Sequence, residues 1–213
     1  MTVLTLHEQT GRGRSALVML PGAYMPAHEF VQAGFMQSLV DQDLPLDLMV
    51  VDIDLAQTDP EDAQNRVREQ VLMPARARYE RLFVGGISLG GQAALLHAAQ
   101  GAVYIDGLCL LAPYPGSRLA MNAIERAGGL DSWQATALEL SDPDYQIWQW
   151  LKQRPQTASF FMGYGREDRF FDGMQRQAAQ WPLASIDVIP GAHDWPTWKT
   201  LWALFLNRGA FVR

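Results

Sequence analysis

The sequence predicts an α/β fold in which a mostly parallel central sheet is covered by helices on both faces. Short, continuously apolar runs alternate along the chain with longer runs whose apolar residues recur at helical spacing. Strands that are apolar on both faces are typical of a parallel sheet, because helices cover both of its sides. The length of 213 residues suits one domain, which we expect to span residues 1–213.

The first half of the chain contains a weak edge strand and three continuously apolar runs that predict buried strands. A helix is expected after each buried strand. Asp59 and Pro60 mark the start of the second helix, in which we expect a kink near Pro74, because proline removes a helical hydrogen bond. The expected strands are 3–6, 15–20, 48–53 and 82–87, and the expected helices are 26–41, 59–79 and 89–100.

The second half continues the alternation after one interruption. Residues 114–157 follow a buried strand and do not continue the alternation of strands and helices, so we interpret them as an inserted cap or lid. A helix within this insertion begins at Asp142 and Pro143. The expected strands are 105–112, 158–163 and 186–189, and the expected helices are 171–180 and 195–206.

Composition and charge exclude several classes of function. The formal net charge of −6 argues against nucleic acid or an anionic membrane surface as the main partner. The sequence lacks both an apolar run of membrane-spanning length and the basic and apolar regions of a signal peptide. Cys109 is the one cysteine and lies in an apolar run, so no intrachain disulfide indicates an oxidising compartment. We therefore expect a cytoplasmic protein.

One serine lies where a buried strand meets a helix. Ser88 is the middle residue of Gly86-Ile87-Ser88-Leu89-Gly90, at the end of the run 82–87. The turn from strand to helix is sharp, and the flanking glycines avoid collisions with the neighbouring backbone. A serine held in this way exposes its hydroxyl, so the pattern predicts a nucleophile.

A serine hydroxyl needs a base to become nucleophilic, and histidine is the usual one. Ligands of such sheets bind at the carboxyl ends of the strands, and His193 lies in the loop after the last strand. His97 follows Ser88 by nine residues in a helix, about 13 Å by helix rise, and is too far away. His7 belongs to the edge strand, and His28 is a candidate for the substrate pocket and an alternative base. His193 is therefore the predicted base.

The base needs a carboxylate that orients it and stabilises its cation. No acid directly follows the strand 105–112, whereas Asp168 lies in the turn after 158–163 and is the predicted acid. Glu167 is the alternative at the neighbouring position. Asp194 directly follows the predicted base, and we interpret it as the N-cap of the last helix.

The negative charge that develops during attack on a carbonyl group is stabilised by backbone N–H donors. Leu89, directly after Ser88, is expected to supply one such donor at a helix N-terminus. Ala23 is expected to supply the other from the turn after the first buried strand, with Tyr24 as the alternative, since Gly22 allows a close approach. The candidate residues for the substrate pocket are Tyr24, Met25, His28, Tyr114 and Trp148.

The order Ser88, Asp168, His193 on an alternating strand and helix chain resembles the α/β-hydrolase superfamily. The resemblance covers nearly the whole chain and includes the Gly165-x-x-Asp168 turn. The Gly191-x-His193 loop is a further motif of the resemblance, and the stretch Gly191-Ala192-His193-Asp194-Trp195-Pro196-x-Trp198 looks like the His loop of small esterases. These motifs are specific for the superfamily but not for a substrate, because one fold hosts many reactions.

In one turn the sequence departs from the superfamily. The family often has His-Gly after the first buried strand, where this chain has Pro21-Gly22. That histidine is not catalytic, so the departure is expected to change how the turn is supported more than it changes activity.

The resemblance implies hydrolysis of an ester or thioester of a small acyl substrate through an acyl-enzyme at Ser88. No metal or cofactor is implied, since the sequence shows no metal-ligand spacing and no phosphate-binding Gly-Lys-Ser/Thr loop. Two alternatives remain open. The same residues could transfer the acyl group to an alcohol or thiol, or the chain could be a catalytically silent binding or regulatory protein.

Overall fold

The computed structural model describes residues 5–9, 13–155, 159–182 and 185–209. Its strands are β1 (Thr5–Gln9), β2 (Ser15–Leu20), β3 (Leu46–Asp52), β4 (Arg81–Ile87), β5 (Gly107–Leu111), β6 (Ser159–Gly165) and β7 (Ile186–Ile189). They form a seven-stranded sheet in the order β1-β3-β2-β4-β5-β6-β7. Strand β1 is antiparallel to β3, and all other neighbours are parallel. The predicted mostly parallel sheet is confirmed, although part of the expected strand 3–6 lies outside the described residues.

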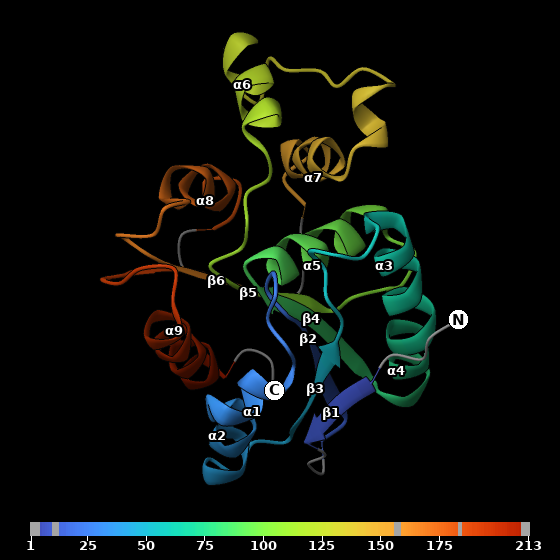
Figure 1. The fold of residues 1–213 in the computed structure, drawn as a ribbon, viewed down its shortest axis with the longest axis vertical. Helices are drawn as coiled ribbons and strands as arrows, with labels where there is room; N and C mark the ends of the chain where they lie inside the picture. Colours follow the sequence, from blue (N-terminus) through green and yellow to red (C-terminus); the bar gives the residue numbers. More distant parts are fainter. Residues whose placement is uncertain (1–4, 10–12, 156–158, 183–184, 210–213) are drawn as a thin grey trace.

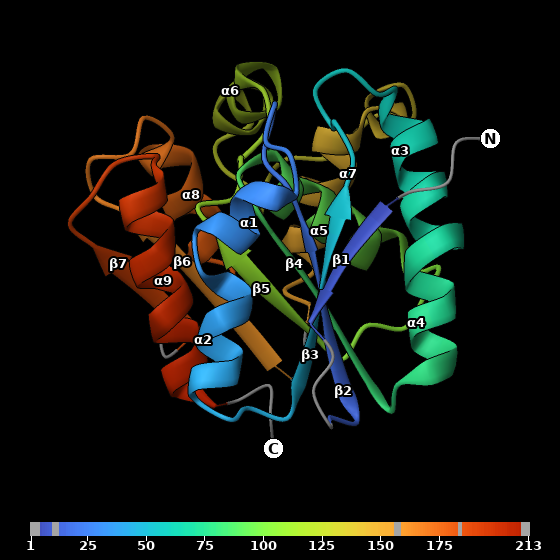
Figure 2. The same ribbon diagram turned by 60° about the horizontal axis from the view of Figure 1, so that its bottom comes forward.

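Helices cover both faces of this sheet. They are α1 (His28–Gln32), α2 (Phe35–Asp41), α3 (Pro60–Val67), the π-helix η1 (Arg68–Leu72), α4 (Met73–Arg78), α5 (Leu89–Gln100), α6 (Arg118–Arg126), the 3-10 helix η2 (Glu139–Ser141), α7 (Pro143–Lys152), α8 (Phe171–Ala178) and α9 (Trp195–Arg208). Helices α2 and α9 lie on one side of the sheet and α5 on the other, with α6 and α7 beyond α5 (Figure 1). Helices α3 and α4 continue one another along one side of the molecule (Figure 2).

The core explains why the apolar runs become strands. Every residue of β2 is buried, as the continuous apolar run predicted. On the outer layer, α2 packs on α9 through the stacked rings of Phe35 and Trp202, whose centroids are 4.7 Å apart. The indole N–H of Trp202 also donates to the Ser38 hydroxyl oxygen at 2.7 Å. These contacts fix α9, whose N-terminal end follows the loop that carries His193.

The prediction of a single helix over residues 26–41 is wrong, because the structure has two helices there. Helix α1 ends at Gln32 and α2 begins at Phe35. Between them Gly34 has a φ of 84°, a left-handed conformation that interrupts a right-handed helix and that glycine adopts without steric cost.

The helix expected over residues 59–79 is present, but it contains a π-helical turn. Asp59 is the predicted N-cap, and its carboxylate accepts from Glu61 N at 3.0 Å and Asp62 N at 3.1 Å. The π-helix η1 directly precedes α4, in whose first turn Pro74 lies. A π-helical turn is a common place for the regular hydrogen bonds of an α-helix to be interrupted. The interruption in this helix therefore lies just before Pro74, where a kink was expected.

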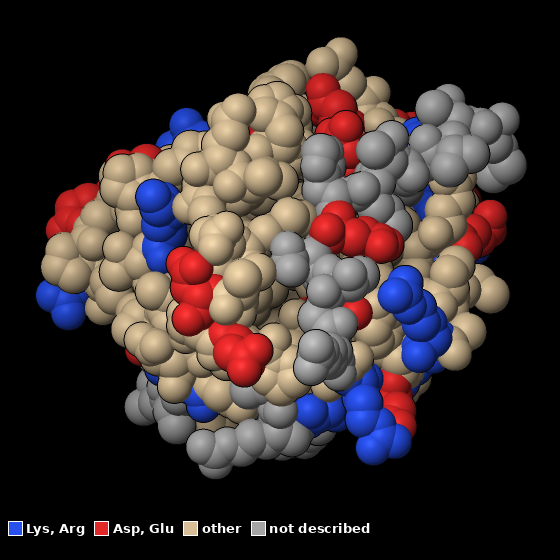
Figure 3. Space-filling model, turned by 90° about the horizontal axis from the view of Figure 1, so that it is seen from below, with Lys and Arg blue, Asp and Glu red and all other residues tan. Residues whose placement is uncertain are grey.

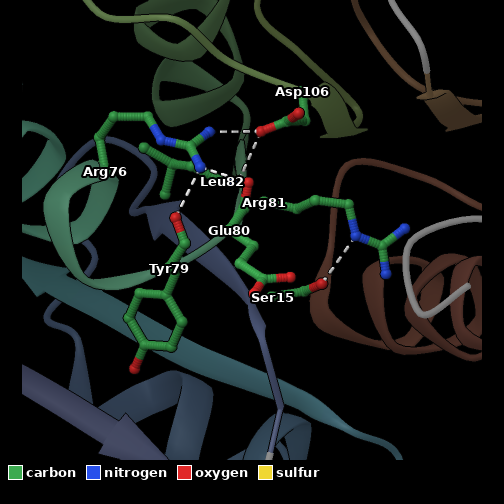
Figure 4. Close-up of polar contacts among 7 residues, drawn as sticks. All are labelled: Ser15, Arg76, Tyr79, Glu80, Arg81, Leu82 and Asp106. Atoms are coloured by element: carbon green, nitrogen blue, oxygen red, sulfur yellow. Dashed lines mark hydrogen bonds and ion pairs between the residues drawn. The ribbon is translucent and has the colours of Figure 1, made fainter.

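Polar contacts fix the amino ends of β2, β4 and β5 (Figure 4). The Arg76 guanidinium binds Asp106 Oδ2 at 2.6 Å and also donates to the Tyr79 carbonyl oxygen at 2.6 Å. The same Asp106 oxygen accepts from Leu82 N at 2.8 Å. Asp106 therefore joins the end of α4 to the start of β4. This contact lies at the amino ends of the parallel strands, whereas Ser88 and Asp168 follow their carboxyl ends.

Asp106→Ala is expected to lower the free energy of unfolding by about 2 kcal/mol, because it leaves the Leu82 N–H and the Arg76 guanidinium without this partner. Urea or thermal unfolding followed by circular dichroism measures the change. The control is Asp131→Ala, which removes an exposed ion pair with Arg154 at 3.7 Å and should change stability little. Equal destabilisation by both substitutions would contradict the structural role of Asp106.

Three further features complete the description of the fold. No helix within the described residues is both long and apolar enough to cross a bilayer. Acidic and basic side chains are interspersed on the face seen in Figure 3. At one edge of the sheet lies β7, a strand of four residues, and its Asp187 pairs with Arg208 of α9 at 2.7 Å.

Candidate active site

Ser88 lies on a sharp turn between β4 and α5. Its φ of 52° and ψ of −116° are rare for a residue with a side chain, and such a conformation costs about 1–3 kcal/mol. Hydrogen bonds hold it there on both sides. Ser88 N donates to the Leu111 carbonyl oxygen at 3.1 Å, and the Ser88 carbonyl oxygen accepts from Tyr114 N at 2.8 Å.

The two glycines around Ser88 are required by close backbone contacts. A Cβ atom on Gly86 would overlap the backbone of Gly90, and a Cβ atom on Gly90 would overlap the Leu20 carbonyl group. The turn is therefore pressed against the end of β2. This is the steric reason that the sequence pattern predicted for the glycines.

His193 lies between Ser88 and Asp168. Its Nε2 atom is 2.9 Å from Ser88 Oγ, and its Nδ1 atom is 2.6 Å from Asp168 Oδ2. The Asp168 side chain is fully buried, and that of His193 is 9% exposed. A carboxylate only accepts hydrogen bonds, so Nδ1 carries the proton and Nε2 is free to accept one from the serine. The three residues that the sequence singled out thus lie in one hydrogen-bonded row.

The other candidate acid supports the backbone of the His193 loop. The Glu167 carboxylate accepts from the Gly191 N–H, two residues before His193. Asp194, the predicted N-cap of α9, accepts from Thr197 N at 3.1 Å and from Thr197 Oγ1 at 2.7 Å. Asp168 is in turn fixed by a hydrogen bond from Phe170 N to its second oxygen, at 2.8 Å.

Two aromatic rings that were not among the predicted site residues hold the imidazole. Phe170 and Trp198 each contact the His193 ring edge-to-face, with centroids 5.2 Å from it. Trp198 was recognisable as an apolar residue of the last helix and as the end of the stretch that resembles an esterase His loop. Phe170 follows Asp168 by two positions, and that proximity was the one signal available in the sequence.

The other histidines lie elsewhere or face solvent. His97 is buried in α5, where burial and, secondarily, the nearby Arg68 guanidinium lower its pKa to about 4. His28 is exposed at the start of α1. His7 lies in β1.

The two expected oxyanion donors lie on either side of Ser88. Leu89 is the first residue of α5. Ala23 lies in a turn closed by a 3.3 Å hydrogen bond from Met25 N to the Gly22 carbonyl oxygen. This turn contacts the nucleophile turn, since a Cβ atom on Gly22 would be 3.6 Å from Ser88 Cβ. Neither the Ala23 N–H nor the Leu89 N–H donates to an acceptor among the described residues.

The structure shows what supports this turn in place of the histidine that the superfamily often has there. The Gly22 N–H contacts Met25 Sδ at 3.4 Å. Further along, Ala27 N donates to Asp52 Oδ1 at the end of β3, at 3.2 Å. The indole N–H of Trp195 donates to Glu29 of α1 at 3.0 Å and so ties α1 to α9. The sequence indicated a different support but could not show these partners.

A cavity of about 300 Å³ lies between α3, α5 and the start of α7. We call it the Leu89 cavity, after the residue next to Ser88 that lines it. Tyr114 also lines it, and burial, with the nearby Asp144 carboxylate as a second cause, raises the pKa of its hydroxyl. The insertion expected at 114–157, which contains α6, η2 and α7, therefore contributes to this cavity.

The remaining pocket candidates lie outside the Leu89 cavity. Trp148 is buried and donates its indole N–H to the Pro115 carbonyl oxygen at 3.2 Å. It lines a second cavity, of about 240 Å³, between α6, α7 and α8. Met25 is buried behind the Gly22 turn, whereas Tyr24 is 72% exposed and has a φ of 56°.

Comparison with known proteins identifies the fold. No protein-family model and no curated protein matches the sequence. Similar solved structures include the fluorophosphonate-binding serine hydrolase F of Staphylococcus aureus, which is 12% identical over 95% of this chain and 84% of its own, with a TM-score of 0.66. An S-formylglutathione hydrolase of Agrobacterium tumefaciens has 12% identity over 99% of this chain and 90% of its own, with a TM-score of 0.66.

A third similar structure is the monoacylglycerol lipase of Paleococcus ferrophilus, with 12% identity, coverage of 99% of each chain and a TM-score of 0.66. Likeness at this identity shows the fold. The α/β-hydrolase fold that the sequence motifs predicted is thereby confirmed.

Proposed function

We propose that this chain, which has the α/β-hydrolase fold, is a serine hydrolase that cleaves an ester or thioester of a small acyl substrate. The observation that carries the proposal is the row of contacts from Ser88 Oγ to His193 Nε2 at 2.9 Å and from His193 Nδ1 to Asp168 at 2.6 Å. The similar structures named as a serine hydrolase, an S-formylglutathione hydrolase and a monoacylglycerol lipase support the same reaction class.

In the acylation step, Ser88 Oγ attacks the substrate carbonyl carbon while His193 Nε2 takes the serine proton. Asp168 stabilises the imidazolium that forms and keeps its Nδ1–H in place. The N–H groups of Ala23 and Leu89 donate to the oxyanion of the tetrahedral intermediate. When that intermediate collapses, His193 gives its proton to the departing alkoxide or thiolate, and the acyl group remains on Ser88.

In the deacylation step, His193 takes a proton from water as the water oxygen attacks the acyl-enzyme. The second tetrahedral intermediate collapses with return of the proton to Ser88 Oγ, which releases the carboxylic acid. The insertion 114–157 acts as the cap over this site. Its attachment to α5 through the contact between Asp144 and Gln92 supports that role.

The proposal is tested by labelling with a fluorophosphonate probe, which phosphonylates an activated serine. The wild-type protein is expected to be labelled, and Ser88→Ala is expected to lose the label. Circular dichroism checks that both samples are folded. A folded wild-type protein that takes up no probe would exclude the serine nucleophile.

A further inference from the structure

The Leu89 cavity is small, and most of its wall is apolar. At the roughly 30 Å³ that one water molecule takes up in the liquid, its volume of about 300 Å³ corresponds to roughly ten water-sized groups. This is close to the lower limit of ligand pockets in proteins. The apolar side chains of its wall include Leu55, Ala63, Ala93 and Leu96.

The charged side chains that line this cavity, among the described residues, are both acidic. They are Asp142 and Asp144, at the start of α7. Asp144 accepts hydrogen bonds from Ser117 N at 2.6 Å and from the Gln92 amide, and burial raises its pKa. Asp142 is exposed, whereas Asp144 is partly buried, so the Asp144 carboxylate repels an anion and attracts a cation more strongly than a carboxylate in water does.

The acidic character continues beyond the cavity. A groove of about 590 Å³ shares Pro60, Gln64, Leu96 and Pro143 with the Leu89 cavity and so lies next to it. Asp59 and Glu61 line this groove, and so does Arg68, which pairs with Glu69 at 3.1 Å. The groove next to the cavity is therefore lined by two carboxylates and by one guanidinium that is paired with a third carboxylate.

Gln64 lies where the cavity and the groove meet. It is 8% exposed, and its amide nitrogen donates to the Ala93 carbonyl oxygen at 3.3 Å. That contact fixes the orientation of the amide, because its oxygen would be repelled by the same carbonyl. The Gln64 Oε1 atom has no hydrogen-bond partner within the described residues. A buried acceptor without a donor costs free energy, and a ligand that brings a donor within reach of it recovers that cost.

We propose that the Leu89 cavity binds the acyl part of the substrate and selects an acyl group of up to roughly ten non-hydrogen atoms that ends in a hydrogen-bond donor. The donor is a hydroxyl or a protonated amine, and a carboxylate at that end is excluded. This inference rests on the proposed function, since it assumes that the acyl group is held on Ser88.

Four p-nitrophenyl esters with six-carbon acyl groups test the selection. They are the hexanoate, the 6-hydroxyhexanoate, the 6-aminohexanoate and the monoester of adipate. We expect kcat/KM for the hydroxyl and ammonium esters to exceed that of the adipate ester by roughly tenfold or more, after subtraction of the uncatalysed rate. The difference in kcat/KM between the ammonium and adipate esters should decrease as sodium chloride is added, because salt screens the charges.

Variants that remove a charge test which carboxylates cause the discrimination against the adipate ester. Asp142→Asn keeps a good N-cap residue on α7, and Asp144→Asn keeps an oxygen acceptor for Ser117 N. Each is expected to raise kcat/KM for the adipate ester several-fold relative to the ammonium ester. Asp62→Asn is the matched control, because Asp62 lies on α3 outside the cavity and groove linings, and it should leave the ratio unchanged.

Gln64→Met replaces the amide by an apolar side chain of similar length. In the wild type we expect a higher kcat/KM for the 6-hydroxyhexanoate than for the hexanoate, and Gln64→Met is expected to remove that preference. If the wild type is labelled by the fluorophosphonate probe but hydrolyses the ammonium and adipate esters equally well, the inference is overturned while the proposed function stands. Absence of labelling overturns the proposed function and this inference with it.

Discussion

Ser88→Ala is expected to lower kcat for p-nitrophenyl butyrate by roughly three or more orders of magnitude. Removal of Oγ leaves His193 without a group to activate, so no acyl-enzyme can form. Any residual rate would come from binding and from the N–H donors around the oxyanion. Initial rates with protein purified in parallel measure the loss.

The variant should fold, because alanine replaces serine in the same strained turn without adding an atom. The matched control is Ser15→Ala, which removes a hydroxyl at the opposite edge of the sheet, where Ser15 accepts from Arg81 at 3.0 Å. We expect this control to keep wild-type turnover. A Ser88→Ala variant within tenfold of the wild type would show that another group carries the reaction.

Asp168→Asn is expected to lower kcat by roughly 10⁴. The amide replaces a buried carboxylate 2.6 Å from His193 Nδ1, so it no longer compensates the imidazolium charge and no longer enforces the Nδ1–H tautomer. The substitution preserves size and the hydrogen bond from Phe170 N. The loss should therefore fall on kcat and not on folding, which thermal unfolding checks.

Glu167→Gln makes the same chemical change one residue earlier and serves as the control. The glutamine oxygen can still accept from the Gly191 N–H, so the His193 loop keeps its backbone support. We expect activity within a few-fold of the wild type. A large loss at Glu167 together with a small one at Asp168 would reverse the assignment of the acid.

The strands and the positions of Ser88, Asp168 and His193 could be predicted because they follow from local patterns in the sequence. Continuous apolar runs mark strands buried on both faces, and the ends of such strands in a parallel sheet lie at one edge. Ser88 directly follows such a run, and Asp168 and His193 lie in the loops after β6 and β7. The structure brings these three side chains within hydrogen-bonding distance, and the roles assigned to them remain for the substitutions above to test.

The walls of the site could not be predicted, because they depend on which way loops and helices turn. Tyr24 and Met25 are neighbours in the sequence, yet one side chain is exposed and the other is buried. Trp148 belongs to the insertion, but it faces a cavity other than the one beside Ser88. Gln64 was inconspicuous in the sequence, and only the packing of α3 against α5 places it at the end of the Leu89 cavity.

The short strand β7 has a consequence for how this protein behaves at high concentration. The outer strand of an open sheet presents free N–H and C=O groups that can pair with a strand of another copy. A strand of four residues offers few such groups, and the charged pair of Asp187 and Arg208 lies along it. Short length and charge on an edge strand are features that protect native sheets from edge-to-edge aggregation.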